Sequence, residues 1–358
     1  MKIRIQPVEP AKRRPKPADE SKLVFGKTFS DHMFMMDYKG EKGWQDPRVV
    51  PHQVLQMDPA AMVLHYGQGI FEGMKAYRCS DGRLHLFRPE KNFERYNRSA
   101  AKLCMPQIEV PFQFEALYEL LKLDKDWIPH SMGSSLYIRP TMIASEPHLG
   151  VRPANEYLHF IITGPVAAYY PEGFNPVSIY VSDQFVRTVR GGLGEAKTMA
   201  NYASSLYAAE YAKKKGFTQV LWLDAVELRF VEEVGTMNIF FRIKDELVTP
   251  PLGGSILAGI TRDSVIQLAE HWGITVHQRP IEIGEVIDAV RSGDMKEIFG
   301  TGTAAVVSPV GSISYKDQSF KIQNGAAGEW SQKLYDEIVG IQYGEKEDPF
   351  GWVHELKV

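Results

Sequence analysis

Cysteine is scarce in this chain of 358 residues, which contains only Cys79 and Cys104. Two cysteines are too few for a disulfide scaffold or a thiolate metal site, and such low usage is typical of a reducing compartment. The sequence therefore predicts a cytoplasmic protein without a metal site.

Long apolar runs and an excess of charge of one sign are missing as well. No run approaches the roughly 20 apolar residues that a membrane-spanning helix needs. The 41 basic and 44 acidic residues leave a net charge of only −3, so no global field draws the chain to nucleic acid or to a membrane surface. We therefore expect a small molecule as its partner, and neither nucleic acid nor membrane.

The chain is long and apolar enough to bury more than one core. Hydrophobic residues make up 44% of it and aromatic residues 11%, and its length suggests two domains. The proline-rich and glycine-rich stretch near residues 166–177 is typical of an interdomain loop. We predict a flexible N-terminal tail over 1–20, a small α+β domain over 21–165, and a large α/β domain over 178–358.

Strands and helices of the first half come in groups. Alternating apolar segments and a Ser-Asp-Gly turn predict strands and a hairpin up to residue 88, and two helices follow over 89–105 and 112–128. A helix is also predicted from about residue 201 to 215. Grouped elements favour a mixed α+β fold over strict βα alternation.

Lys197 lies in the stretch RGGLGEAKTMANY, residues 190–202, after three glycines and before a helix-forming run. Most loop lysines are solvated, and the P-loop pattern that would make this one a phosphate ligand is absent. A third interpretation is a Schiff-base lysine, because small neighbours permit burial, burial lowers the pKa of an amine, and a neutral amine attacks an aldehyde. The loop alone does not decide among the three.

A lysine bonded to pyridoxal phosphate needs an anion at the pyridinium nitrogen, a phosphate cradle and a donor at the phenolic oxygen. Glu232 and Glu233 precede an apolar strand, whose alternation lets only one of them point inward; a solvated acidic pair is the alternative. The helix start at Ile260 and the turn at Gly302 offer backbone N–H groups to an anion. Arg95 is either a surface residue or a phosphate clamp.

Residues 300–305, GTGTAA, formally satisfy the dinucleotide pattern GxGxxG/A and make a nicotinamide oxidoreductase an alternative. That pattern needs a helix directly after it. Here Val306 to Pro309 continue an extended chain, which argues against a Rossmann turn.

Seven separated stretches resemble, in order and approximate spacing, those of branched-chain amino acid aminotransferases, which are pyridoxal-phosphate enzymes of fold type IV. They are LHYGQGIFEGMKAYR, FRPEKNFERYNRSA, SLYIRP, GGLGEAKTMANY, EVGTMNIFF, GITRDS and GTGTAAVVSPV. The resemblance extends from about Phe25 to Tyr343. It implies a two-domain fold like that of D-amino acid aminotransferase, with the cofactor at the domain interface.

The resemblance also implies roles for the cofactor residues. Lys197 matches the lysine that forms the Schiff base and moves the proton between substrate Cα and cofactor C4′. Tyr202 matches the tyrosine at the phenolic oxygen, and Glu233, selected over Glu232, matches the pyridinium partner. The implied phosphate cradle consists of Arg95, Ile260, Thr261 and Thr303.

A substrate site follows from the same resemblance. Arg139 matches the residue that receives the distal carboxylate of glutamate or 2-oxoglutarate; a structural ion pair with a nearby carboxylate is the alternative. Tyr66 approaches from the first domain or from a second subunit. The α-carboxylate site matches Thr236, Ala304 and Ala305, and the apolar wall matches Phe71, Tyr137, Val151 and Tyr169, for each of which ordinary aromatic or apolar core is the alternative.

The implied activity is reversible ping-pong transfer of the amino group between L-leucine, L-isoleucine or L-valine and 2-oxoglutarate, by a homodimer. D-amino acid aminotransferases and aminodeoxychorismate lyases share the fold and are alternatives. The stretch LHYGQGIFEG, Arg139 and the extended N-terminal region favour the branched-chain enzymes. A non-catalytic scaffold is a remote alternative, against which Lys197 and Glu233 count.

Overall fold

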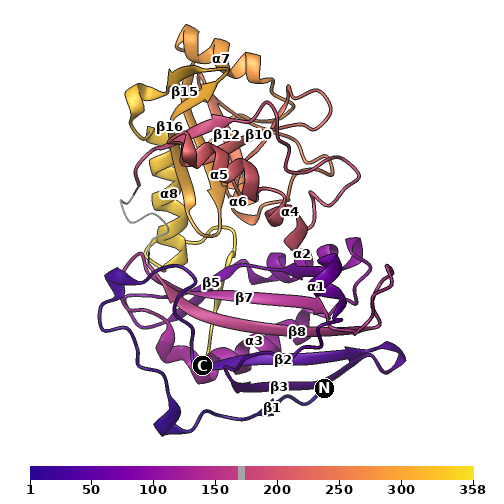
Figure 1. The fold of residues 1–358 in the computed structure, drawn as a ribbon. Helices are drawn as coiled ribbons and strands as arrows, with labels where there is room; N and C mark the ends of the chain where they lie inside the picture. Colours follow the sequence, from indigo (N-terminus) through magenta and orange to yellow (C-terminus); the bar gives the residue numbers. More distant parts are fainter. Residues whose placement is uncertain (168–173) are drawn as a thin grey trace. The chain divides into compact units, whose positions relative to one another are not determined.

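The computed structural model describes residues 1–167 and 174–358, which form two compact units, each built on a sheet of its own (Figure 1). The first unit comprises Met1–Tyr169, Ala196–Met199 and Gly340–Val358, and the second comprises Tyr170–Glu195 and Ala200–Val339. This mixture of sheets and helices agrees with the predicted α+β fold class. Within the described ranges, no helix is long and apolar enough to cross a membrane.

The sheet of the first unit has the strand order β1-β3-β2-β8-β7-β5-β6-β18, and β4 pairs with β7. Strands β1 and β3 pair in parallel, while β2, β8, β7, β5 and β6 pair antiparallel with their neighbours. The strands are β1 (Arg4–Ile5), β2 (His32–Lys39), β3 (Trp44–Pro51), β4 (Gly69–Phe71), β5 (Met74–Arg78), β6 (Leu84–Phe87), β7 (Ser135–Ala144), β8 (Glu156–Val166) and β18 (Val353–Glu355).

Helices α1 (Met62–Tyr66), α2 (Pro89–Lys102) and α3 (Val110–Asp124) belong to this unit. Leu136 and Ile138 of β7 share one buried core with apolar residues of α2 and α3. Successive strand residues point to opposite faces, so Tyr137 and Arg139 lie on the face of the sheet away from these helices. The fold thereby separates a packed face from a face that carries polar and aromatic side chains.

The sheet of the second unit has the order β11-β10-β9-β16-β15-β12-β13-β14, and β17 pairs with β16. Parallel pairs, such as β9 with β10 and with β16, and antiparallel pairs are mixed within it. The strands are β9 (Val177–Val181), β10 (Gln219–Leu223), β11 (Val231–Val234), β12 (Asn238–Ile243), β13 (Glu246–Thr249), β14 (Val276–Gln278), β15 (Met295–Gly302), β16 (Val306–Tyr315) and β17 (Gln318–Lys321).

The remaining helices are α4 (Met199–Ala203), α5 (Leu206–Lys214), α6 (Ile260–His271), α7 (Ile283–Ser292) and α8 (Glu329–Gln342). Helices α4 and α5 replace the single helix predicted over about 201–215. The Ser204 hydroxyl donates to the carbonyl of Asn201 at 3.0 Å, and the Ser205 hydroxyl donates to that of Tyr202 at 2.7 Å. Such bonds to nearby backbone compete with helix continuation.

The GTGTAA stretch joins two antiparallel strands. β15 ends at Gly302 and β16 begins at Val306, and these two residues are paired across the hairpin. A strand, and not a helix, follows the glycines, as the sequence context indicated. A strand, turn and antiparallel strand cannot form the βαβ unit that a dinucleotide-binding turn requires.

Both ends of the chain differ from the expected domain boundaries. Residues 340–358, predicted in the large domain, lie in the first unit (Figure 1). Strand β18 pairs with β6, and Trp352 and Leu356 are buried. The N-terminal tail, predicted to be flexible, contributes β1, and Ile3 and Val8 are each only 8% exposed. Both segments are too short for a periodic pattern, so only long-range pairing determines their place.

Candidate active site

The backbone around Lys197, which belongs to the first unit, is held by hydrogen bonds within that unit. Its amide donates to the Ser99 hydroxyl at 2.9 Å, and its carbonyl accepts from the Phe71 amide at 3.0 Å. The Thr198 hydroxyl donates to the Gly69 carbonyl at 2.8 Å. The Lys197 side chain is half-buried, less enclosed than the sequence suggested, and its Nζ lies 5.1 Å from the centroid of the Phe71 ring.

Close packing within the second unit explains one of the glycines before Lys197, Gly194. A Cβ atom on Gly194 would lie 2.1 Å from the carbonyl oxygen of Ser255. Only glycine permits this close approach of two backbone segments. The contact between the Gly194 and Ser255 backbones therefore holds the chain in place shortly before Lys197.

Glu72, directly after Phe71, is fully buried and holds Arg95 of α2. The Arg95 Nε and Nη2 donate to its two oxygens at 2.7 and 2.9 Å, and Asn92 Nδ2 donates at 2.8 Å. Burial raises the pKa of the Glu72 carboxyl, but Arg95, Lys197 and Asn92 outweigh burial, so the net pKa lies below its usual value. Such a bidentate pair fixes the plane of the guanidinium.

Phe71, Tyr137 and Arg139 form one cluster on the open face of the first sheet. The Arg139 guanidinium lies 4.7 Å from the Phe71 ring centroid and 5.2 Å from that of Tyr137, and its Nη2 donates to the Tyr137 hydroxyl at 3.1 Å. Its Nε is buried without a hydrogen-bond partner among the described residues. No carboxylate within the described ranges forms an ion pair with Arg139, so the structural pairing considered above is not observed.

Two cations thus lie against the same Phe71 ring, Arg139 and Lys197. Gly73 makes room for this cluster, because a Cβ atom there would lie 2.0 Å from the Tyr137 hydroxyl oxygen. Lys75, which the sequence did not single out, is opposite Tyr137 in the β5–β7 pairing and shares its face. Lys75 is 8% exposed, and burial lowers the pKa of its amine to about 8.

Other residues predicted for the substrate site, Tyr66 and the wall residue Val151, lie elsewhere. Tyr66 is 40% exposed and its hydroxyl donates to the carbonyl of Leu149, while Val151 is 84% exposed. The structure does not bring either one to Phe71, Tyr137 and Arg139. Tyr169 lies outside the described residues.

Glu233, in the second unit, is held by contacts with two other side chains. It is buried on β11, forms an ion pair with Arg187, and accepts from Asn238 Nδ2 at 3.2 Å. Tyr202 of α4 is half-buried; burial lowers the pKa of Arg187, and the nearby Tyr202 opposes this shift. Arg187 lies in no recognisable motif, and Asn238 lies in the stretch EVGTMNIFF without a predicted role of its own.

Glu232 faces a different environment, as strand alternation requires. Its carboxylate accepts from the Ser255 hydroxyl at 2.5 Å, and with Ser255 it lines a pocket of about 390 Å³ in the second unit. Burial raises the pKa of this carboxyl. The two adjacent glutamates therefore have separate partners.

The first turn of α6 and the turn between β15 and β16 both adjoin this region. Asn238 also donates to the Leu257 carbonyl at 2.9 Å, and a Cβ on Gly259 would lie 1.9 Å from Asn238 Oδ1. One side chain thus links Glu233 to the N-terminus of α6, where Ile260 and Thr261 lie. Helix N-termini favour anions because their first N–H groups point outward.

The residues predicted for the α-carboxylate, with Thr303 of the predicted phosphate cradle, lie at one end of the second sheet, whereas Arg95 belongs to the first unit. Asn238 pairs with Thr301, so the turn with Thr236 adjoins the turn with Thr303, Ala304 and Ala305. Thr301 Oγ1 is buried without a hydrogen-bond partner among the described residues. Val306, directly after this turn, has a φ of 61°, which a β-branched residue adopts only under strain and which is common at ligand sites.

Comparison with known proteins gives consistent matches. Residues 69–313 match the family described as Amino-transferase class IV. The "Branched-chain-amino-acid aminotransferase 2" of Bacillus subtilis (strain 168) is 56% identical over 344 residues, 96% of this chain and 94% of its own length.

Two solved structures are similar over most of the chain. The Escherichia coli branched-chain amino acid aminotransferase has a TM-score of 0.75 at 25% identity, covering 92% of this chain and 99% of that one. The T.th. branched-chain amino acid aminotransferase complexed with N-(5'-phosphopyridoxyl)-L-glutamate has a TM-score of 0.74 at 26% identity, covering 90% and 97%.

Proposed function

The chain belongs to the class IV aminotransferases, and on this premise we propose that it is a branched-chain amino acid aminotransferase. It transfers the amino group reversibly between L-leucine, L-isoleucine or L-valine and 2-oxoglutarate. The high identity to a relative of that name over nearly the whole chain supports the proposal.

The cofactor is pyridoxal phosphate, and the residues present fit it. Glu233 is a buried carboxylate, Thr301 Oγ1 is a buried hydroxyl oxygen without a partner among the described residues, and α6 offers a helix N-terminus. When bound, pyridoxal phosphate supplies an aldehyde that takes up the amino group and a ring that accepts electrons. We propose that Arg95, Ile260, Thr261 and Thr303 hold the phosphate and that Tyr202 donates to the phenolic oxygen.

Lys197 and Glu233 have different tasks in the proposed reaction. The Lys197 amine carries the proton to and from the substrate Cα as a general base and acid. Glu233 keeps a proton on the ring nitrogen, and Arg187 and Asn238 fix the orientation of its carboxylate.

The observation that carries the choice of amino acceptor is the position of Arg139. This guanidinium is stacked on Phe71, the same ring that Lys197 approaches, and its buried Nε has no hydrogen-bond partner within the described ranges. A buried donor left without a partner costs free energy. The distal carboxylate of 2-oxoglutarate or glutamate would satisfy it, whereas Phe71 and Tyr137 offer apolar surface to a branched side chain.

The rest of the substrate site is part of the same proposal. Thr236, Ala304 and Ala305 receive the α-carboxylate, supported by the meeting of their two turns at one end of the second sheet. Val151 and Tyr169 belong to the proposed apolar wall, and Tyr66 to the proposed α-carboxylate site. Because Tyr66 and Val151 are exposed and lie apart from Phe71 in this chain, they would act in the site of a second subunit.

We further propose a cytoplasmic homodimer. Leu64, Tyr66, Leu149 and Val151 are all at least 40% exposed, an apolar surface that a second subunit would cover. The two free cysteines, Cys79 and Cys104, are consistent with a reducing compartment.

A comparison of amino donors tests the proposal. The purified holoenzyme is assayed for glutamate formation from 2-oxoglutarate with L-leucine or D-alanine as donor. Turnover with L-leucine and little with D-alanine is expected. Turnover of D-alanine alone would favour a D-amino acid aminotransferase, pyruvate release from aminodeoxychorismate would favour the lyase, and no turnover would favour a scaffold.

A further inference from the structure

An N-terminal strap, defined here as residues 8–30, runs along the first unit and is fixed at several points. The Val8 amide donates to His32 Nε2 at 2.9 Å, and the Arg14 amide donates to Asp31 Oδ1 at 2.8 Å. Farther along, the Glu20 carboxylate accepts from the Ser131 amide at 2.7 Å. The strap is thus attached by backbone and side-chain bonds to residues distant in sequence.

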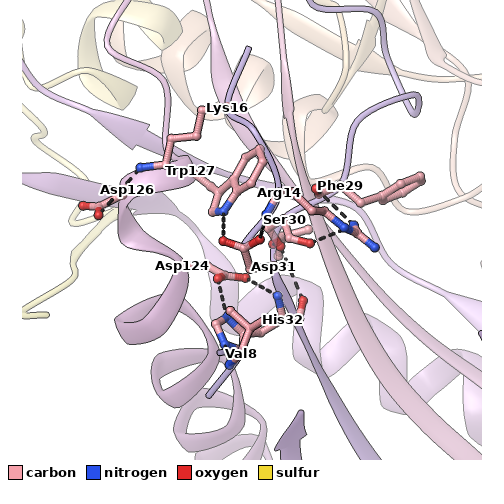
Figure 2. Close-up of polar contacts among 11 residues, drawn as sticks. Val8, Arg14, Lys16, Phe29, Ser30, Asp31, His32, Asp124, Asp126 and Trp127 are labelled. Atoms are coloured by element: carbon pink, nitrogen blue, oxygen red, sulfur yellow. Dashed lines mark hydrogen bonds and ion pairs between the residues drawn. The ribbon is translucent and has the colours of Figure 1, made fainter. Parts of the chain in front are cut away.

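Figure 2 shows the centre of this attachment, a buried clasp made of Asp31, His32, Asp124 and Trp127. Trp127 Nε1 donates to Asp31 Oδ2 at 3.0 Å, and the His32 amide donates to Asp124 Oδ2 at 3.1 Å. His32 Nδ1 lies 2.6 Å from Asp124 Oδ1. All four residues are at most 9% exposed.

The clasp and the strap need each other. The Val8 N–H donates to His32 Nε2, so that nitrogen carries no proton, and Nδ1 donates to Asp124. The Asp31 carboxylate is satisfied by one donor from the strap, the Arg14 amide, and one from Trp127. Releasing the strap would leave buried acceptors unpaired, which is unfavourable.

The strap leads to the predicted substrate residues. The Phe25 ring lies 4.8 Å from the Tyr137 ring, edge to face at 70°. The Thr28 carbonyl covers Gly164, where a Cβ atom would lie 2.1 Å from it, and Gly164 is opposite Tyr137 in the β7–β8 pairing. The strap therefore covers the same place on the sheet from which Tyr137 holds Arg139.

We propose that the clasp is a positioning device for substrate recognition, acting through the strap. It presents Phe25 to Tyr137, and Tyr137 fixes Arg139 for the distal carboxylate of a dicarboxylic 2-oxo acid. This inference rests on the proposed function and deepens it. Asp31, His32, Asp124 and Trp127 are positioning residues, since none of them touches substrate.

Phe25 is the first residue to test. Phe25→Ala is expected to raise the KM for 2-oxoglutarate about three- to tenfold, the range that loss of an edge-to-face aromatic pair gives. The KM for L-leucine and kcat should change less than about twofold, because the strap orients Arg139 and not Lys197. Phe25→Tyr keeps the ring and should restore the wild-type KM.

The clasp and the strap are tested by two variants. Trp127→Phe removes one donor to Asp31 and keeps the ring packing, and Arg14→Ala removes the guanidinium bonds to the carbonyls of Phe29 and Ser30. Both should raise the KM for 2-oxoglutarate and speed tryptic cleavage after Lys22. Lys16→Ala removes only an exposed 3.7 Å ion pair with Asp126 and serves as the matched control. It should behave like wild type in both measurements.

The outcomes separate this inference from the function on which it rests. A wild-type protein that transfers no amino group from L-leucine contradicts both. If the wild type is active, unchanged KM values in Phe25→Ala and Arg14→Ala contradict the strap proposal alone. Equal changes for both substrates with a lowered Tm would also contradict it, because they would indicate a purely structural role.

Discussion

At the residue scale, the arrangement depends on a few close contacts that tolerate little change. Gly73 is the clearest case, because its missing Cβ leaves room for the Tyr137 hydroxyl. That hydroxyl is the acceptor for Arg139 Nη2. A single methyl group at residue 73 therefore acts on the proposed carboxylate site without touching Lys197.

We expect Gly73→Ala to raise the KM for 2-oxoglutarate roughly tenfold, since displaced Tyr137 no longer orients the charge-assisted contact of Arg139. Steady-state kinetics with both substrates measures this. Gly284→Ala, in helix α7 with nothing within 4 Å of the added Cβ, is the control. A Gly73→Ala enzyme with wild-type KM for 2-oxoglutarate would show that Tyr137 has no such role.

Glu72 is a second residue that tolerates little change, because its charge balances that of buried Arg95. Glu72→Gln leaves Arg95 buried without its counter-charge, and we expect a loss of about 3–5 kcal/mol in the free energy of unfolding. Chemical denaturation measures it, and weaker retention of pyridoxal phosphate on dialysis should accompany it. Glu94→Gln, which removes exposed ion pairs with Lys91 and Arg98 on the same helix, should change stability by less than about 1 kcal/mol. Equal stability of the two variants would contradict this account.

At the element scale, the two faces of the first sheet carry different side chains, one apolar and packed, the other polar and aromatic. Alternation along β7 sends Leu136 and Ile138 to the core and Tyr137 and Arg139 to the open face. The neighbouring strand β8 contributes His159, which is buried and hydrogen-bonded to Tyr96 at 2.7 Å. Burial lowers the pKa of His159 to about 3.

His159 makes this element sensitive to acid. Its folded pKa of about 3 is below the ordinary value of 6.5, so between these pH values the unfolded chain binds a proton that the folded protein does not. Above pH 6.5 the contribution of His159 to the free energy of unfolding is fully present. As the pH falls from 6.5 toward 3, protonation of the unfolded chain reduces that free energy. His159→Asn should therefore lose less stability on acidification, by about 1.4 kcal/mol per pH unit.

Urea denaturation at several pH values from about 7 down to about 4 checks this prediction. His65→Asn, at an exposed position, should follow the wild-type pH dependence. Parallel curves for wild type and His159→Asn would mean that His159 is protonated in the folded protein.

At the scale of the whole molecule, the chain returns at its end to the unit in which it began. Strand β18 extends the first sheet next to β6, and Trp352 packs on Phe350 at 4.3 Å between ring centroids and on Phe87 at 5.6 Å. Helix α8 precedes this return. Residues 340–358 therefore stabilise a unit whose sheet otherwise comes from the first half of the chain.

Trp352→Ala should lower the free energy of unfolding by about 3–5 kcal/mol, because a large buried ring is removed. Thermal and chemical denaturation measure this loss. Lys357→Ala, at an exposed position in the same C-terminal segment, should leave stability unchanged. A stable Trp352→Ala protein would mean that the C-terminal segment is dispensable for the first unit.

The sequence allowed some of this organisation to be predicted and not the rest. The glycine loop and strand alternation, which are local signals, drew attention to Lys197 and to the pair Glu232 and Glu233. The family resemblance was needed to choose the Schiff-base interpretation of Lys197 and to select Glu233. The partner Arg187 is 46 residues from Glu233 in sequence and leaves no local pattern. Ser99 and Asn238 lie within matched stretches, but only tertiary contacts reveal that they hold Lys197 and Glu233. The first part of the strap was predicted to be flexible for the same reason, since its hydrogen bonds depend on tertiary packing.

The central claim is that the amine of Lys197 carries the cofactor and the proton. Borohydride reduction of the holoenzyme, followed by peptide mapping, tests it most directly. We predict a phosphopyridoxyl group on the peptide that contains Lys197, and none after Lys197→Arg, with a loss of leucine transamination on the order of a thousandfold. Label on another lysine, or an active Lys197→Arg enzyme, would contradict the account.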